Sequence, residues 1–206
     1  MKKLVVLIIG ILITIISFIF DAEIVKWISL FRNNSLNEFF LGITFVSSEI
    51  VIFFFLTSLF LWQGHKRKWI LPLWITLFLS AVVSFVLKFG VHRLRPFQQD
   101  LVSVLPILEK SNHLVWNFSF PSFQSMLAFC AVPILVKEFP KFKYAWIIFA
   151  GLVAFSRVYF GLHFLSDVIA GGLIGLIIGW AIIKFEEKYN FGEKSYKKII
   201  YLKNKI

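Results

Sequence analysis

The sequence predicts an all-α, polytopic membrane protein in which a bundle of six transmembrane helices forms a single domain over residues 1–206. Two observations support this prediction. First, 59% of the residues are apolar and 26 are Phe, which exceeds the apolar content of ordinary soluble domains. Second, charged segments separate six apolar runs, most of them close to the length of about 20 residues that crosses the hydrocarbon core of a bilayer.

The six apolar runs define the expected spans in chain order. Their approximate bounds are 4–20, 39–62, 69–91, 122–136, 144–160 and 164–183. The first run follows two lysines, but no small-residue cleavage pattern comes after Phe20, so we interpret it as a retained span and not as a signal peptide. Apolar residues at helical spacing from Ile24 to Phe31 then predict a short helix in the membrane interface.

Basic residues in the loops set the expected orientation, because Lys and Arg in short loops mark the cytoplasmic side. They gather at the amino end, in the second and fourth loops and in the tail: Lys2, Lys3, Lys66, Arg67, Lys68, Lys137, Lys141, Lys143 and the seven lysines of residues 184–206. The loop 21–38, by contrast, mixes charges of both signs. Both termini are therefore expected in the cytoplasm, with 184–206 as a basic cytoplasmic tail.

The net charge of +11 lies mostly on this cytoplasmic side. Attraction to anionic lipid heads explains such a charge better than nucleic-acid binding, so the expected partner is the bilayer and no nucleic acid is expected. Cys130 is the only cysteine, which excludes an intrachain disulfide and a multi-cysteine metal site. We expect no cofactor, and the sequence leaves the oligomeric state open.

Polar residues recur at the outer ends of four expected spans. They are Lys88 and Arg95 at the outer end of the third span, Ser122 at the outer start of the fourth, Arg157 at the outer end of the fifth, and His163 and Asp167 at the outer start of the sixth. Ionisable groups at membrane depth are costly unless they are paired, so the cluster is a candidate site. Three cations beside one carboxylate predict that an anion is missing, and such cations bind phosphate. The start of the fourth span adds free backbone N–H groups.

His163 and Asp167 are four residues apart and would share one face of a helix. The carboxylate could then orient one ring nitrogen and leave the other free to attack phosphorus. This arrangement suits a covalent phosphohistidine that water later hydrolyses. An isolated His and Asp near a helix start would more often serve capping or packing, but the neighbouring cations favour the catalytic interpretation.

Three motifs carry a family resemblance. The first is Lys88 with six residues before Arg95-Pro96, the second is Pro121-Ser122, and the third is Ser156-Arg157 with five residues before His163 and three more before Asp167. Together they resemble the type 2 phosphatidic acid phosphatase superfamily, whose membrane members remove phosphate from lipid phosphates and lipid diphosphates. The resemblance implies that His163 is the nucleophile and Asp167 its partner, and it implies no metal. The implied phosphate cradle is Lys88, Arg95, Ser122, the backbone at Phe123, and Arg157.

One motif departs from the family, which has Pro-Ser-Gly-His where this chain has Phe123 and Gln124. The family's second histidine protonates the leaving group, and an amide cannot do so. The favoured hypothesis is a membrane enzyme that hydrolyses a lipid diphosphate, such as a polyprenyl diphosphate, or a lipid phosphate, with its site on the non-cytoplasmic side of the cell membrane. The alternatives are an impaired or inactive member that binds lipid phosphates, and a lipid phosphotransferase.

Other residues could supply the missing proton. His92 and His113 lie near the predicted cluster in sequence, and Glu49 lies within the second expected span. A carboxyl group at membrane depth should be protonated or paired. For Glu49, neutralisation of a neighbouring cation is the favoured interpretation and an acid role is the alternative.

Overall fold

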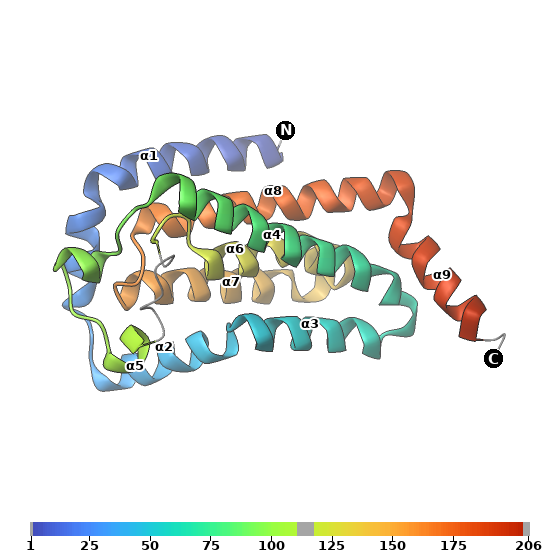
Figure 1. The fold of residues 1–206 in the computed structure, drawn as a ribbon, viewed down its shortest axis with the longest axis horizontal. Helices are drawn as coiled ribbons and strands as arrows, with labels where there is room; N and C mark the ends of the chain where they lie inside the picture. The colour runs from blue at the N-terminus through green and yellow to red at the C-terminus, as the bar shows by residue number, and fades with distance from the viewer. Residues whose placement is uncertain (1, 111–117, 204–206) are drawn as a thin grey trace.

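The computed structural model describes residues 2–110 and 118–203, which form a bundle of helices without strands. In chain order the elements are α1 (Lys2–Ser29), α2 (Asn34–Val46), α3 (Glu49–Trp62), η1 (Gly64–Trp69), α4 (Ile70–Val91), η2 (Pro96–Gln99), α5 (Pro106–Lys110), α6 (Phe123–Glu138), η3 (Pro140–Phe142), α7 (Lys143–Tyr159), α8 (Leu165–Tyr189) and α9 (Phe191–Lys203). The helix α6 lies inside the bundle and packs against α4, α7 and α8 (Figure 1). The predicted all-α class is therefore confirmed.

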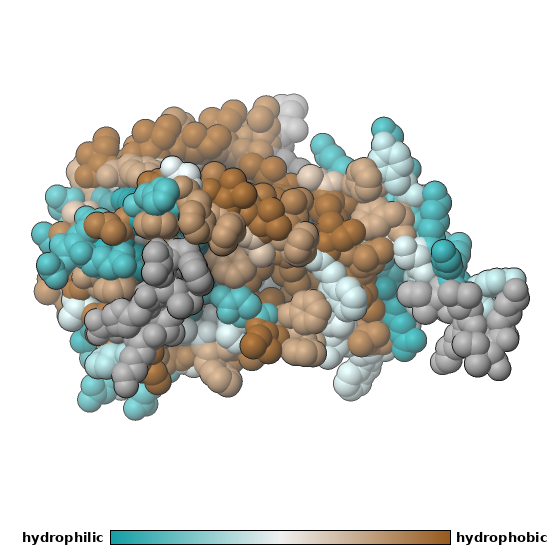
Figure 2. Space-filling view, viewed as in Figure 1, coloured by the Kyte–Doolittle hydropathy of each residue, from teal (hydrophilic) through white to brown (hydrophobic). Residues whose placement is uncertain are grey.

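The surface of the bundle is apolar where a bilayer would surround it. Figure 2 shows apolar residues across the middle of the visible face and polar residues gathered at its two ends. Large side chains such as Phe54 and Phe78 are 64% and 70% exposed, which would be unfavourable in water. Together with the long apolar helices, this makes the chain an integral membrane protein.

Helix length and composition give fewer than six candidate spans among the described residues. Four helical stretches in the described part are long and apolar enough to cross a membrane, and the bent pair of α2 and α3 would add a fifth. The expected fourth span corresponds to α6, which has only 16 residues. The six-span arrangement and its orientation thus stay predictions.

The first helix is longer than expected. The sequence predicts a span over 4–20 and a separate interfacial helix from Ile24, but α1 runs without a break from Lys2 to Ser29. Asp21, which was placed in a loop, lies within this helix and is only 3% exposed. Its carboxylate accepts a hydrogen bond from the backbone N–H of Ser166 at 3.0 Å and pairs with Arg93 at 2.8 Å. Because the charge is neutralised inside the bundle, the helix continues past it.

The second expected span, 39–62, is also different, because it is broken in the middle. The helix α2 ends at Val46, α3 begins at Glu49, and the two axes are bent by 61°. Ser47 closes α2 through its backbone N–H, which donates to the carbonyl of Ile43 at 2.9 Å, and Ser48 is extended. The break brings Thr44, Ser48 and Glu49 to one cavity.

Glycines hold α8 unusually close to α6. A Cβ atom on Gly171, Gly175 or Gly179 would lie 2.3–2.5 Å from a backbone oxygen of the segment 122–130, closer than real Cβ contacts come. Small residues permit this kind of backbone approach between helices in lipid. At Gly171 the facing oxygen is that of Ser122, so the packing also sets the position of the turn before α6.

The described part of the expected tail 184–206 is helical on both sides of Asn190. The helix α8 continues to Tyr189, and α9 follows after Asn190, whose φ of 51° ends α8. The carboxylate of Glu186 accepts the backbone N–H of Gly192 at 2.8 Å, which fixes the turn. In Figure 1 both ends of the chain lie away from the α7–α8 turn, where the site described below is found.

Candidate active site

A cavity of about 300 Å³ lies where α2, α3, α6 and the α7–α8 turn meet. Its lining includes Arg95, Gln124, Arg157, His163 and Glu49, all of which were candidates from the sequence. The remaining lining residues are Thr44, Ser48, Leu108 and Leu162. Two of the three predicted cations and the predicted nucleophile are therefore brought together.

The ring of His163 is held in one tautomer by its two neighbours. Its Nδ1 lies 2.7 Å from the carbonyl oxygen of Ser119, which can only accept, so Nδ1 carries the proton. Its Nε2 lies 3.2 Å from Nη1 of Arg95, which can only donate, so Nε2 holds a lone pair. Burial and the charge of Arg95 lower the pKa of His163 to about 3. The ring is thus neutral and lies on the wall of the cavity.

The role of Asp167 differs from the expected direct contact with the ring. Its Oδ2 lies 3.8 Å from Nδ1 of His163, too far for a hydrogen bond. Instead Oδ2 accepts the backbone N–H of Phe164 at 2.8 Å and the hydroxyl of Ser119. Asp167 therefore holds Ser119, and the Ser119 carbonyl holds the ring.

Arg93 completes this arrangement, and the sequence analysis missed it. Its Nη1 donates to Oδ1 of Asp167 at 2.6 Å, and its Nη2 donates to Oδ2 of Asp21 at 2.8 Å. The guanidinium carbon also lies 4.1 Å from the centre of the Phe164 ring. One arginine thus pairs two buried carboxylates. The sequence offered a signal for this pairing. Arg93 is a third cation inside the first motif, two residues before Arg95, and Asp21 is an acidic residue directly after the first apolar run.

Lys88 does not line the cavity, contrary to the expectation that it contacts phosphate. Its ammonium group donates to the carbonyl of Phe118. The same extended segment is held by the backbone of Ser119, whose N–H donates to the Arg93 carbonyl at 2.7 Å, and by the N–H of Ser122, which donates to the Asp167 carbonyl at 3.1 Å. Lys88 therefore fixes the segment that orients His163.

Several buried polar atoms at the site have no hydrogen-bond partner among the described residues. They are Nε of Arg157, the hydroxyl of Thr44 and the hydroxyl of Ser122. Arg157 makes only a long contact through Nη2, 3.4 Å from the hydroxyl of Ser47. Leaving such groups unsatisfied is costly, and an anion that accepts several hydrogen bonds would remove the cost. Thr44 carries no charge and lies in a different run, so spacing gave no signal for it.

The other candidates lie outside the cavity. Phe123 begins α6 and packs on a core cluster that includes Leu127, so its side chain does not fill the cavity. His92 ends α4 in the left-handed conformation, with its ring 4.5 Å from that of Phe118. His113 lies outside the described residues. Within residues 2–110 and 118–203, no group of three or more His, Cys, Asp or Glu side chains is arranged to hold a metal ion.

Comparison with known proteins assigns the family. Residues 69–191, more than half of the chain, match the model of the PAP2 superfamily. The chain belongs to the PAP2 superfamily. This segment includes all three motifs and both helices that flank His163, so the PAP2 match covers most of the candidate site.

The PAP2 relatives are membrane lipid phosphatases. The chain is 33% identical over 185 residues to phosphatidylglycerophosphatase B of Bacillus subtilis strain 168, covering 82% of this chain and 84% of that protein. It is 30% identical over 168 residues to an undecaprenyl-diphosphatase of Sulfolobus acidocaldarius, covering 81% and 79%. The crystal structure of a PAP2-type phosphatidylglycerolphosphate phosphatase from Bacillus subtilis superposes with a TM-score of 0.71 at 28% identity, covering 92% and 98%.

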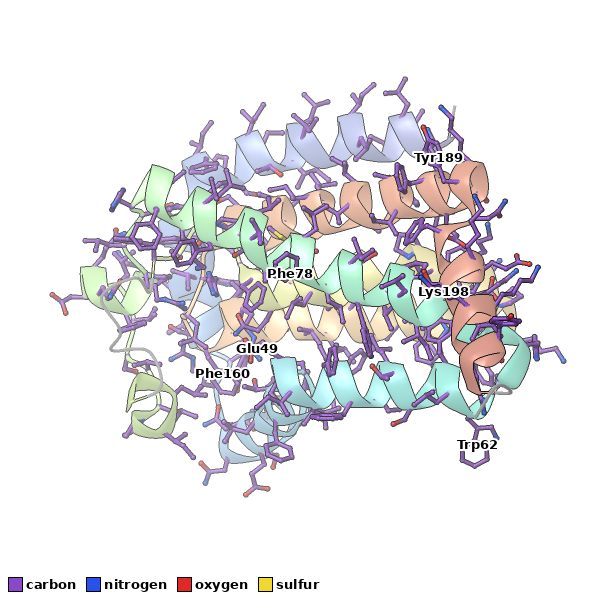
Figure 3. All side chains as sticks on the ribbon, turned by 45° about the vertical axis from the view of Figure 1, so that its right-hand side comes forward. Glu49, Trp62, Phe78, Phe160, Tyr189 and Lys198 are labelled. Carbon is purple, nitrogen blue, oxygen red and sulfur yellow. The ribbon has the colours of Figure 1, made fainter. Side chains whose placement is uncertain are left out.

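At the position where the predicted PAP2 motif has histidine, Gln124 makes a defined contact. Its Nε2 donates to Oε1 of Glu49 at 3.0 Å, across the cavity from α6 to α3. Figure 3 shows Glu49 at the start of α3, where α2 and α3 meet. A carboxyl group thus lies beside the amide.

Proposed function

We propose that this PAP2 protein hydrolyses the phosphate or diphosphate head of a membrane lipid through a phosphohistidine on His163. The observation that carries the proposal is the fixed tautomer of His163, with the Nε2 lone pair on a cavity that also holds Arg95 and Arg157. A neutral imidazole next to two guanidinium groups is suited to attack a bound phosphoryl group. The same cations would stabilise charge on the phosphoryl oxygens in the transition state.

The unpaired polar atoms support a phosphate in this cavity. Nε of Arg157 and the hydroxyl of Thr44 belong to residues that line it, and both atoms are buried without partners among the described residues. The hydroxyl of Ser122 is equally unpaired, although Ser122 does not line the cavity. Ser122 also precedes the first turn of α6, where backbone N–H groups and the helix dipole favour an anion. When phosphate binds, Arg95 would turn from Nε2 of His163 to a phosphate oxygen, which frees the lone pair for attack.

A lipid diphosphate, such as a polyprenyl diphosphate, is the favoured substrate. Gln124 can donate a hydrogen bond but not a proton, and general acid catalysis is typically worth about 100-fold to 10,000-fold. Whichever group supplies the proton, acid catalysis matters most for a lipid monophosphate, whose leaving group is a basic alkoxide. A phosphate leaving from a diphosphate is much less basic. The undecaprenyl-diphosphatase among the relatives is consistent with this choice.

The proposed site faces the non-cytoplasmic side of the membrane. The basic segments that mark the cytoplasmic side, including Lys66, Arg67 and Lys68 and the end of α8, lie at the end of the bundle away from the α7–α8 turn. His163 lies in that turn. The apolar belt between these ends would place the cavity within reach of lipid head groups in the outer leaflet.

Phosphate release from two lipids tests this substrate class. The purified protein, supplied with undecaprenyl diphosphate and with phosphatidic acid in the same detergent micelles, is expected to release phosphate from the diphosphate at least about 10-fold faster, because the less basic leaving group needs less acid catalysis. The measurement is kcat/KM from liberated inorganic phosphate. A faster release from phosphatidic acid would contradict the preference, and no release from either lipid would favour a binding protein.

A further inference from the structure

Glu49 is a carboxyl group at a position where the sequence predicts an unbroken apolar helix. The break at Ser47 and Ser48, with its 61° bend, makes Glu49 the first residue of α3 and puts its side chain on the cavity that holds His163 and Arg157. A continuous helix over 39–62 would have no such turn at this depth. The break therefore delivers an ionisable group to the reacting centre.

The amide of Gln124 fixes this carboxyl group. Its Nε2 donates to Oε1 of Glu49 at 3.0 Å. The bond engages one carboxyl oxygen as an acceptor, which orients Oε2 as the oxygen that can carry a proton. A glutamine at position 124 thus positions a proton donor, although it cannot be one itself.

We infer that Glu49 is the general acid and base of this site, positioned by Gln124; the inference rests on the proposed phosphohydrolase function. Glu49 and His163 line one cavity of about 300 Å³, so a phosphoryl group bound between Arg95 and Arg157 would contact both. The nucleophile and the acid then approach from different elements, the α7–α8 turn and the start of α3. Two groups on different elements can serve the entering and the leaving side of one phosphoryl group.

A bound phosphate group would promote protonation of Glu49. In the free site, Glu49 and Arg157 line the same cavity. A phosphate group brings two negative charges between them, and a carboxylate beside such an anion takes up a proton to relieve the repulsion. Because Glu49 is exposed at the mouth of the cavity, that proton can come from water. Neutralisation of a neighbouring cation, the role favoured from sequence, is compatible with this acid role in the substrate-free site.

The reaction then has two steps, formation of the phosphohistidine and its hydrolysis, and Glu49 gives up one proton in the first and regains one in the second. In the first, Nε2 of His163 forms a bond to phosphorus, the bond to the leaving oxygen breaks, and the proton on Oε2 of Glu49 moves to that oxygen. In the second, water attacks phosphorus, its proton moves to the Glu49 carboxylate, and the bond from phosphorus to Nε2 breaks. The proton on Nδ1 stays with His163 throughout, held by the Ser119 carbonyl.

The test compares two substrates with one lipid tail and different leaving groups, farnesyl phosphate and farnesyl diphosphate. Replacement of Glu49 by Gln keeps the shape and removes the proton. It is expected to lower the single-turnover rate of leaving-group release, the step that uses Glu49 as the acid, about 100-fold or more for the monophosphate and less than about 10-fold for the diphosphate. The retained diphosphate activity shows that the variant is folded. The double variant Glu49→Gln, Gln124→His is expected to recover at least about 10-fold of the lost monophosphate rate.

The matched control is Glu38→Gln, which changes an exposed carboxylate on α2 that does not line the cavity and should leave both rates unchanged. Equal loss on the two substrates in Glu49→Gln, or no loss on either, overturns the inference. A wild-type protein that cleaves only the diphosphate also overturns it, because no acid is then in use. Failure of the proposed function looks different: the wild type would cleave neither substrate, or the His163→Ala variant would retain full activity.

Discussion

Replacing His163 by alanine is expected to lower phosphate release by about 10,000-fold or more, for lipid monophosphates and diphosphates alike. The side chain is only 1% exposed, and it supplies the nitrogen lone pair that faces the cavity. Arg95 and Arg157 cannot take over this role, because their guanidinium groups carry no lone pair. The measurement is a single-turnover rate of phosphate release with enzyme in excess.

The matched control for this variant is His65→Ala. His65 lies in the exposed helix η1, beside the basic residues at the opposite end of the bundle, and its replacement should leave the rate unchanged. A His163→Ala protein with more than about one tenth of the wild-type rate would contradict a nucleophilic role for this residue.

Replacing Arg93 by alanine is expected to destabilise the protein by about 3–5 kcal/mol, the usual cost of removing one partner from a buried ion pair. Both of its carboxylate partners are inside the bundle: the side chain of Asp167 is 0% exposed and that of Asp21 is 4% exposed. Activity should fall as well, since Asp167 would no longer hold Ser119 in place for His163. The measurement is the temperature at which the detergent-solubilised protein loses its fold and its activity.

An exposed arginine provides the comparison for Arg93. Arg67 donates to the Leu61 carbonyl at 3.0 Å at the surface, so the Arg67→Ala variant should lose no more than about 1 kcal/mol and keep its activity. Asp21→Asn, combined with Arg93→Gln, should cost less than the sum of the single changes, because the two residues share one interaction. Wild-type melting in the Arg93→Ala protein would show that the ion pairs contribute nothing.

Much of the site could be predicted from the sequence, because its charged residues lie near the ends of the expected spans and at short distances from one another along the chain. His163, Arg95 and Arg157 are costly at membrane depth, and the ends of neighbouring helices were expected at one level. The structure places all three on one cavity. The all-α class followed in the same way from long apolar runs, whose interpretation needs no knowledge of tertiary contacts.

The hydrogen-bond partners could not be predicted, because they depend on how distant segments approach. The spacing of His163 and Asp167 favours a direct contact, yet the Ser119 carbonyl lies closer to the ring, at 2.7 Å against 3.8 Å. Two contacts fix the position of that carbonyl. Lys88, in α4, donates to the carbonyl of Phe118, and the backbone carbonyl of Arg93, just after α4, accepts the N–H of Ser119. No periodicity within one helix reports such a contact.

The break between α2 and α3 was missed for a related reason. Hydropathy averages over a whole run, and the run 39–62 is apolar enough to hide three polar residues in its centre. Only the structure shows that Ser47 and Ser48 end one helix and that Glu49 starts the next. Likewise Asp21 was assigned to a loop from its charge alone, although Arg93 and Ser166 neutralise it within a helix.

Trapping of the covalent intermediate tests the central claim most directly. The protein, mixed with a lipid diphosphate labelled in its terminal phosphoryl group and quenched in alkali within one turnover, should carry the label on His163, since a phosphorus–nitrogen bond survives base and is lost in acid. Mass spectrometry of the peptide that contains His163 locates the label. The account predicts an acid-labile phosphoryl group on that peptide and none in the His163→Ala variant. Turnover with no label on His163, or a label that persists in the His163→Ala variant, would contradict it.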